Sequence, residues 1–349
     1  MDKALREFLV KEIKFKRCSL APLDILLLIG TSVAGACLRE SVVSYVSMEG
    51  FTMAQTAMLN QLKLLSFLFD TFLAILVMDM VITHTGNKIK GFLAYGVMIL
   101  LPVLTASSAM WGLGDQVYVF FALLAVAYLL KGKKNLGLIS LGISILINSN
   151  GLFLLPVFIG LYLKKEVKTV SFLAPLFGFV GNRLLVTGIL PIKIPMITAD
   201  NLLKSTREKA LLSYNYPNIY QIFGTEQFVE EYSQAAYWFV ICLGLIMGII
   251  IGLSKRPLTK ERIVRLFVLS AIVIPYFAPF MNERSGMLAD VTAVVLGFFV
   301  FKKFYIPLVQ VIISYVAYSA YFRGESVMPM ALVAAVSLVL IMDLIREEA

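Results

Sequence analysis

Residues 107–134, SSAMWGLGDQVYVFFALLAVAYLLKGKK, contain the pattern that decides the fold of this chain. A short polar stretch with one carboxylate, Asp115, leads into an apolar run that ends at Lys131. The run is continuous rather than alternating, so it predicts a helix and not a strand of a membrane barrel. Similar runs recur along the chain, many of them near the roughly 20 residues that cross about 30 Å of hydrocarbon. The sequence therefore predicts an all-α, polytopic integral membrane protein.

The overall composition supports the same class. The chain has 349 residues, of which 59% are hydrophobic and 15% are charged, whereas soluble domains are about half apolar and about a quarter charged. The net charge of +9 does not indicate a nucleic-acid partner, because the basic residues form short clusters between apolar runs. Cys18, Cys37 and Cys242 are scattered, so a disulfide framework is not expected.

The apolar runs predict about 12 transmembrane helices with both termini in the cytoplasm. This topology places 22 of the 31 lysines and arginines inside and 9 outside, as the positive-inside rule requires. Residues 1–17 are a cytoplasmic lead-in, either an amphipathic helix on the inner leaflet or a solvated segment. Residues 18–349 form a single transmembrane domain. The predicted spans are 20–37, 62–82, a third ending near 107, a fourth ending at 130, a short pair within 137–163, 170–190, 235–253, 264–280, 287–301, 304–321 and 327–345.

Four outer loops are expected, near residues 38–61, 108–115, 191–234 and 281–286. The segment 191–234 is longer than most loops, and we expect it to be ordered with short helices. Residues 137–163 contain two short apolar segments around Asn148-Ser149-Asn150-Gly151. Two short tilted helices joined by an Asn-Gly turn are favoured there, and a broken re-entrant pair is the alternative.

Acidic and basic side chains meet on the predicted outer side. A membrane enzyme that acts on a lipid-linked sugar needs a carboxylate to accept the proton of the attacking hydroxyl. It also needs arginine or lysine to neutralise the phosphate leaving group. The outer side offers Glu49, Asp115, Arg183, Glu283 and Arg284.

Four segments resemble, in order, the GT-C superfamily of glycosyltransferases, and most nearly its bacterial mannosyltransferase-like branch from surface-polysaccharide loci. Residues 111–118, WGLGDQVY, are similar to the Trp-Gly-Gln-x-Asp-x-x-Tyr segment of that branch. The other three are residues 66–73 with Phe69-Asp70, residues 213–221 (SYNYPNIYQ), and residues 279–284 (PFMNER) followed by 288–291 (LADV). The resemblance covers about residues 38–322.

The resemblance implies a GT-C-like fold in the bacterial plasma membrane and an inverting glycosyltransferase. Such enzymes take a sugar from a polyprenyl-phosphate-sugar on the outer face and pass it to a lipid-linked or cell-surface polysaccharide acceptor. Glu49, in Ser47-Met48-Glu49-Gly50-Phe51, is then the expected catalytic base, and Asp115 is a second-loop partner that positions the acceptor or a metal. The expected substrate-binding residues are Arg39, Trp111, Arg183, Tyr214, Asn215, Asn218, Tyr220, Glu283 and Arg284. A divalent metal occurs in parts of the family, and no ligand set here establishes one.

The chain departs from the family pattern at several positions. Leu113 replaces a glutamine, Asn282 a histidine and Ser285 a tyrosine, while residues 148–150 replace a Lys-x-Gln motif. These changes indicate either altered substrate choice or loss of catalysis. The alternatives are a polymerase of lipid-linked repeat units, a lipid-linked-sugar transporter and a non-catalytic GT-C-like scaffold.

Several of these residues also have a structural interpretation. Asp70 is explained by a bond to a neighbouring helix, Arg183 by snorkelling to the interface and Trp111 by an interfacial belt. Asn215 and Asn218 are typical turn caps. His84 is the only histidine and is expected on the inner surface.

Overall fold

The computed structural model describes residues 13–14, 19–43, 53–205 and 210–348. Helices account for most of the described residues, and each strand is two residues long. Strands β1 (Ile13–Lys14) and β2 (Ser19–Leu20) pair antiparallel, while β3 (Ser213–Tyr214) and β4 (Met281–Asn282) pair parallel. The α-helices are α2 Pro22–Val43, α3 Met53–Thr85, α4 Lys88–Ile99, α5 Pro102–Ala106, α6 Asp115–Leu130, α7 Lys134–Ile147, α8 Leu155–Leu163, α9 Leu173–Val186, α10 Pro195–Ser205, α11 Ile219–Phe223, α12 Val229–Leu253, α13 Lys260–Phe277, α14 Met287–Phe299, α15 Tyr305–Arg323 and α16 Met330–Glu348.

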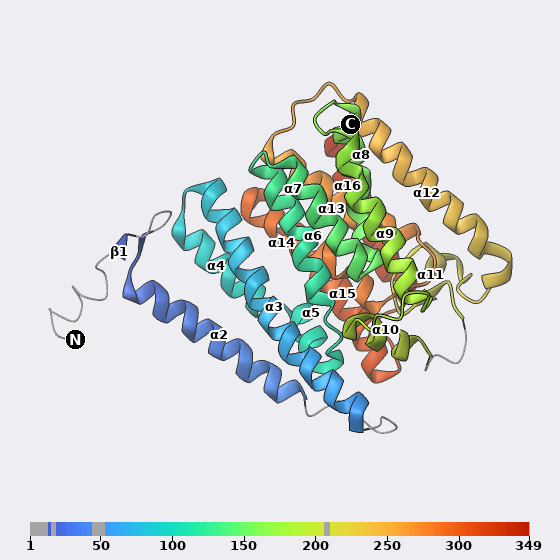
Figure 1. Ribbon diagram of the computed structural model, residues 1–349, viewed down its shortest axis with the longest axis horizontal. Helices are drawn as coiled ribbons and strands as arrows, with labels where there is room; N and C mark the ends of the chain where they lie inside the picture. The colour runs from blue at the N-terminus through green and yellow to red at the C-terminus, as the bar shows by residue number, and fades with distance from the viewer. Residues whose placement is uncertain (1–12, 15–18, 44–52, 206–209, 349) are drawn as a thin grey trace.

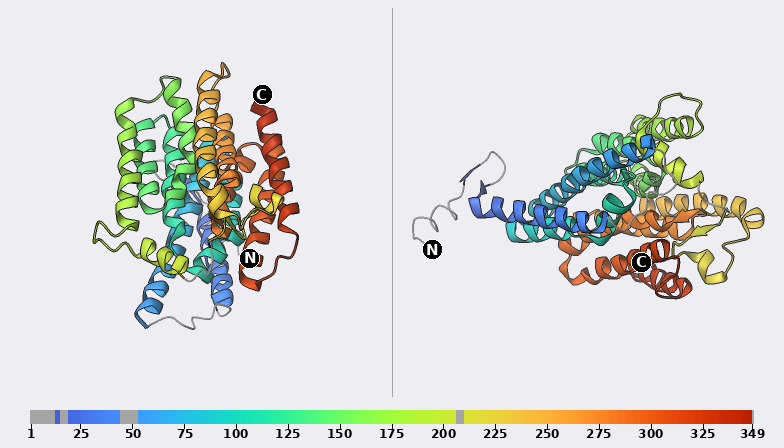
Figure 2. Two further views of the ribbon diagram at one scale, coloured as in Figure 1. Left: turned by 90° about the vertical axis from the view of Figure 1, so that its right-hand side faces the viewer. Right: turned by 90° about the horizontal axis from the view of Figure 1, so that it is seen from below.

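Six helical segments of the described chain are long and apolar enough to cross a membrane. Apolar side chains such as Leu64 and Ile250 are exposed on them, as expected for surfaces that face lipid. Figures 1 and 2 show α2 and α12 on opposite flanks of one helical bundle. The prediction of an all-helical fold is confirmed, and the six apolar segments support the prediction of a membrane protein. The six segments are Pro22–Val42, Thr56–Thr85, Lys88–Trp111, Thr169–Val186, Val229–Leu253 and Phe301–Arg323.

One end of the bundle gathers the basic clusters that the sequence places in the cytoplasm. Arg262 pairs with Glu348 at 2.8 Å and Arg265 with Glu347 at 2.7 Å, which ties α13 to the end of α16. His84 also lies here, and it is not the free surface residue expected from the sequence. Its ring stacks on Phe299, because the end of α3 packs against the end of α14. We call this region the basic end.

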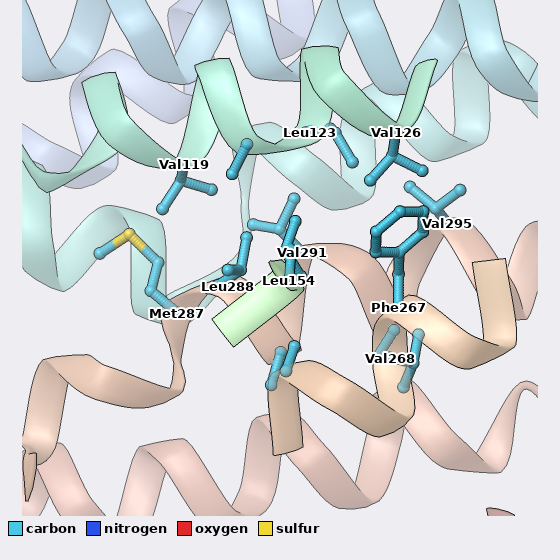
Figure 3. Close-up of a cluster of buried hydrophobic side chains, with 14 of the residues drawn as sticks. Val119, Leu123, Val126, Leu154, Phe267, Val268, Met287, Leu288, Val291 and Val295 are labelled. Atoms are coloured by element: carbon cyan, nitrogen blue, oxygen red, sulfur yellow. The ribbon is translucent and has the colours of Figure 1, made fainter. Parts of the chain in front are cut away.

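The core of the bundle is apolar and lies where α6, α13 and α14 meet (Figure 3). Val119 and Leu123 of α6 face Leu288 and Val291 of α14, and Phe267 of α13 lies beside them. All five side chains are buried. This packing holds fixed the helix ends that carry the polar residues described below.

Glycines allow two pairs of helices, α7 with α9 and α8 with α12, to pack closely. A Cβ atom on Gly178 of α9 would lie 2.2 Å from the Gly142 carbonyl oxygen of α7, so neither position tolerates a larger residue without a shift. On α12, Gly248 and Gly252 pack in the same way against Ile159 and Leu163 of α8. Close approach through small residues is typical of helices in membranes. As a result α9 is fastened to α7, and α12 to α8.

The expected loops differ from the structure in extent. The loop predicted at residues 38–61 is largely helical in its described part, since α2 continues to Val43 and α3 begins at Met53. Residues 53–61 are rich in Ala, Met, Leu and Gln, which favour helix even outside hydrocarbon. The two short helices expected within 137–163 are confirmed as α7 and α8, with a 3-10 segment, η2 (Ser149–Leu154), between them. The short helices expected within 191–234 are α10 and α11.

Candidate functional site

A cavity of about 1100 Å³ lies along α8, α9, α12 and α13. One end of it is polar and contains Asp115, Asn148, Asp200 and Arg284. Because α6 ends at the basic end and Asp115 begins α6, this polar end lies at the opposite end of the bundle. The cavity thus combines a polar terminus with a long apolar body.

Arg284 is the centre of the polar end. Its side chain is only 4% exposed, and its Nη1 donates to Asp115 Oδ2 at 2.6 Å. Its Nη2 donates to Asp200 Oδ1 at 2.7 Å, and Glu283 Oε1 lies 3.8 Å from its Nε. The other oxygen of Asp115 accepts a hydrogen bond from Asn148 Nδ2 at 3.4 Å. Residues from four separated segments therefore meet around one guanidinium.

The electrostatics of this cluster favour a charged arginine. Burial alone would lower the pKa of Arg284, but Asp115, Asp200 and Glu283 raise it well above the ordinary arginine value. Arginine is fully protonated in proteins in any case. With three carboxylates around one guanidinium, the cluster carries an excess of negative charge when its acids are ionised.

The local sequence explains how Asp115 reaches this position. The π-helix η1 (Ser107–Trp111) ends at Gly112, and both Gly112 (φ 61°) and Gly114 (φ 77°) adopt the left-handed conformation that favours glycine. The turn lets α6 begin at Asp115, with its carboxylate at the positive end of the helix dipole. Gly114 also admits Met196 of α10, whose Cγ would lie 2.7 Å from an added Cβ.

The backbone around Arg284 is fixed by a helix cap and by a strand pair. Asn282 caps the short 3-10 helix η4 (Glu283–Gly286) by accepting from the Arg284 backbone N–H, while Ser285 Oγ accepts from the Asn282 N–H. Strand β4 pairs with β3, which fastens the long segment after α10 to the residues before Arg284. Asn282 and Ser285, two positions at which the chain departs from the pattern that it resembles, therefore form a cap.

The body of the cavity is apolar and open on the flank of the bundle. Leu176 and Phe179 of α9 face it from one side, and Ile241 and Leu245 of α12 from the other. All four are between 39% and 54% exposed. Arg183 stands on the same face of α9, seven residues after Leu176, and its exposed side chain lines the cavity. The cavity is therefore a groove between α9 and α12 with its cation near the polar end.

Of the residues predicted to bind substrate or act in catalysis, the structure brings Asp115, Arg183 and Arg284 together at this cavity. Glu283 does not line the cavity and lies buried behind Arg284. Glu49 lies outside the described residues.

Arg39 and Trp111 lie in the interior, away from the cavity. Arg39 donates to Asp70 Oδ2 from Nη2 at 2.8 Å and from Nε at 3.2 Å, and its Nε also donates to Ser108 Oγ. The expectation that Asp70 bonds a neighbouring helix is confirmed. Trp111 is 6% exposed and packs on Tyr318 and Phe322, so it is neither an interfacial belt residue nor a cavity residue. Arg39 is enclosed because α2 packs against α4, α5 and η1. Trp111 is enclosed because aromatic side chains of α15 pack on it.

The motif in residues 213–221 supports the loop rather than lining the cavity. Tyr220 donates its hydroxyl hydrogen bond to the Phe277 carbonyl at 2.8 Å, and the Tyr214 hydroxyl accepts from the Leu211 N–H. Asn218 is fully buried at the start of α11, and Asn215 takes a left-handed turn conformation at φ 55°. The two tyrosine hydrogen bonds therefore explain part of the motif, whereas the side chain of Asn218 makes no cap bond to the described residues, contrary to the turn cap expected from the sequence.

Sequence reasoning missed Asp200 and underrated Asn148. Asn148 had a signal, since it interrupts an apolar run at a helix break. Asp200 had none, because it is one polar residue among many between 191 and 234. The described residues contain no group of three or more His, Cys, Asp or Glu side chains that could hold a metal ion.

No family model matches the chain, and no curated protein matches it either. The family resemblance therefore stays a prediction from the four motifs.

Proposed function

We propose that this protein is a multi-pass membrane glycosyltransferase of the GT-C type that uses a polyprenyl-phosphate-sugar donor. The acceptor is a lipid-linked or cell-surface glycan on the outer face of a bacterial plasma membrane. The observation that carries the proposal is the groove of about 1100 Å³, which joins an apolar body to a charged polar end. A long isoprenoid chain matches the body, and a phosphate-linked sugar matches the end.

The fit to a lipid chain comes from the walls of the groove. Side chains of α9 and α12 line it while remaining exposed on the flank of the bundle, where hydrocarbon of the membrane would meet them. From Leu173 to Arg183 the groove follows α9 for about 15 Å, at 1.5 Å per residue. A lipid tail entering from the membrane can therefore lie alongside α9 with its head near Arg183.

The charges favour Arg183 as the phosphate ligand. Both amino groups of Arg284 already donate to carboxylates, and the surplus of acids around it would repel a phosphate. Arg183 lines the same cavity on its exposed side, so it can meet the anion without breaking an existing pair. In this arrangement Arg284 positions the carboxylates, and their negative charge stabilises the oxocarbenium-like character that glycosyl transfer develops at the anomeric carbon.

The topology supports action on the outer face. The polar end lies opposite the basic end, and the excess of basic residues marks the cytoplasmic side. The 12 predicted crossings with both termini inside agree with this orientation. An outer-face site would use the lipid-linked donor directly and no nucleotide sugar.

Membranes containing the protein test the proposal with labelled polyprenyl-phosphate mannose, glucose or N-acetylglucosamine and an envelope lipid extract as acceptor. We expect label transfer with one donor and release of polyprenyl phosphate. Replacing Arg183 by Gln removes a charged hydrogen bond worth about 1.5–3 kcal/mol, so the KM for the donor should rise on the order of 10- to 100-fold. The matched control is Arg323→Gln, an exposed arginine of α15 that does not line the cavity.

The outcomes separate the alternatives. Folded protein that neither binds polyprenyl phosphate nor transfers sugar refutes the proposal. Binding without transfer for any donor identifies a scaffold or transporter instead.

A further inference from the structure

A second, smaller cavity adjoins the polar end of the groove. Its volume is about 40 Å³, and it lies between the start of α6, the break after α7, and helices α9 and α10. It shares Asp115, Asn148, Ser149 and Asp200 with the groove. A water-sized group needs about 10–15 Å³ of such space, so this side cavity admits a hydroxyl-bearing carbon or a few waters, but not a sugar ring.

The lining of the side cavity is suited to a hydroxyl group. Its lining residues include Asn148, Asn182 and Tyr118 besides Asp115 and Asp200. Tyr118 is 1% exposed, and its hydroxyl makes no hydrogen bond of normal geometry to a described residue, although Asn150 is close to it. A buried hydroxyl without a partner usually indicates a water or ligand that completes its hydrogen bonding. Tyr118 can both donate to and accept from such a group.

The two carboxylates of the side cavity have different surroundings. Asp115 uses one oxygen for Arg284 and the other for Asn148, and its side chain is 8% exposed. Asp200 also pairs with Arg284, but its side chain is 22% exposed and it belongs to the separate helix α10. Asp200 is thus the more exposed of the two acids at the junction of the two cavities.

We propose that the side cavity binds the acceptor hydroxyl and that Asp200 accepts its proton. This inference rests on the proposed glycosyltransferase function. The acceptor oxygen forms a bond to the anomeric carbon, while the bond from that carbon to the phosphate oxygen breaks and its electrons remain on the leaving polyprenyl phosphate. The hydroxyl proton moves to the Asp200 carboxylate. Asp115 and Arg284 are positioning residues for this acid, and Tyr118 orients the incoming hydroxyl.

The variant Asp200→Asn tests the role of the carboxylate, because it keeps the shape of the side chain and an oxygen acceptor for Arg284. We expect its kcat for sugar transfer to fall about 10²- to 10⁴-fold, the usual contribution of a general base. The KM for the donor and the affinity for sugar-free polyprenyl phosphate should stay within about threefold of wild type. If Asp200 only supported the structure of the site, both quantities would change as well. Asp200→Glu should retain more kcat than Asp200→Asn.

Two further variants complete the test. Tyr118→Phe removes one hydrogen bond of about 1 kcal/mol, so the KM for the acceptor should rise roughly fivefold while the KM for the donor is unchanged. Glu231→Gln, at an exposed acid in the first turn of α12, should behave as wild type.

The possible results distinguish failure of this inference from failure of the proposed function. Wild-type transfer with an unaffected Asp200→Asn overturns the inference and leaves the proposed function standing. A loss in Asp200→Asn that comes only through weaker donor binding overturns it as well. A wild-type protein without transfer or polyprenyl phosphate binding overturns the proposed function and this inference together.

Discussion

The buried pair of Arg39 and Asp70 allows the sharpest test of the packing. Arg39 is 5% exposed and Asp70 is fully buried. Besides its bonds to Asp70 and Ser108, Arg39 donates from Nη1 to the backbone carbonyl of Ile99 at 3.0 Å. Replacing Arg39 by Met keeps much of the apolar stem and removes every one of these donors. The carboxylate of Asp70 then stays buried without its arginine.

Breaking a buried ion pair from one side costs about 3–5 kcal/mol, because it leaves an uncompensated charge. At roughly 2–4 °C per kcal/mol for a chain larger than a small domain, the apparent Tm of Arg39→Met should fall by on the order of 10 °C. In the double variant Arg39→Met/Asp70→Leu no charge remains buried, so most of the lost stability should return. The exposed residue Arg323 supplies the control, and Arg323→Met should change the Tm little.

The assay is thermal unfolding in detergent, followed by size exclusion of the protein that stays folded, together with donor KM. A structural pair predicts lower stability and an unchanged KM in the protein that remains folded. The reasoning would be refuted by an Arg39→Met protein of wild-type stability, or by a double variant as unstable as the single one. A raised donor KM at full stability would instead restore the substrate-binding role that the sequence resemblance assigns to Arg39.

Three other perturbations follow from the packing. Gly178→Ala places a methyl group against the Gly142 carbonyl and should cost about 1–3 kcal/mol in thermal unfolding, whereas Gly30→Ala, with nothing within 4 Å of the added carbon, should be neutral or stabilising. Gly244→Phe fills the groove beside Pro156, so the donor KM should rise severalfold while the Tm stays at the wild-type value. Gly30→Phe is the matched control. Equal donor KM values for the two variants would show that no lipid tail occupies the groove. Glu347→Gln removes a partner of both Arg265 and Lys303 at the basic end. It should lower the free energy of unfolding by about 0.5–1 kcal/mol in low salt and by less in 1 M salt. The control Glu325→Gln should show no such dependence on salt.

The helices and the two ends of the bundle could be predicted because their signals are local. Apolar runs mark each helix, and the basic clusters that follow them meet at one end. The break at Asn148 was visible for the same reason, since a polar residue interrupts a run. Asp115 and Arg284 were predicted as site residues from their position at the ends of apolar runs and from the family resemblance, without knowledge of the contact between them.

The remaining features of the site depend on contacts between segments that are distant in the sequence, and no local pattern predicts such contacts. Asp200 lies 84 residues from Arg284 in the chain, within a segment where polar residues are common. Arg39 looked like an outer-loop cation because α2 continues further than its apolar run. Tyr220 looked like a ligand contact, because a residue type that binds sugars also satisfies a buried loop backbone, here the Phe277 carbonyl.

The contact between Arg284 and its carboxylates changes how the site should be understood. An arginine beside an apolar groove suggests a phosphate ligand, yet both of its amino groups are committed to acids. Displacing either acid would break a charge-assisted hydrogen bond to the buried Arg284 guanidinium, which is costly. A phosphate is therefore accommodated with less loss at Arg183, on the exposed side of the groove. In the proposed reaction the two arginines would separate the charges, because Arg183 would face the leaving phosphate and the acids held by Arg284 would face the carbon and the proton that become positive.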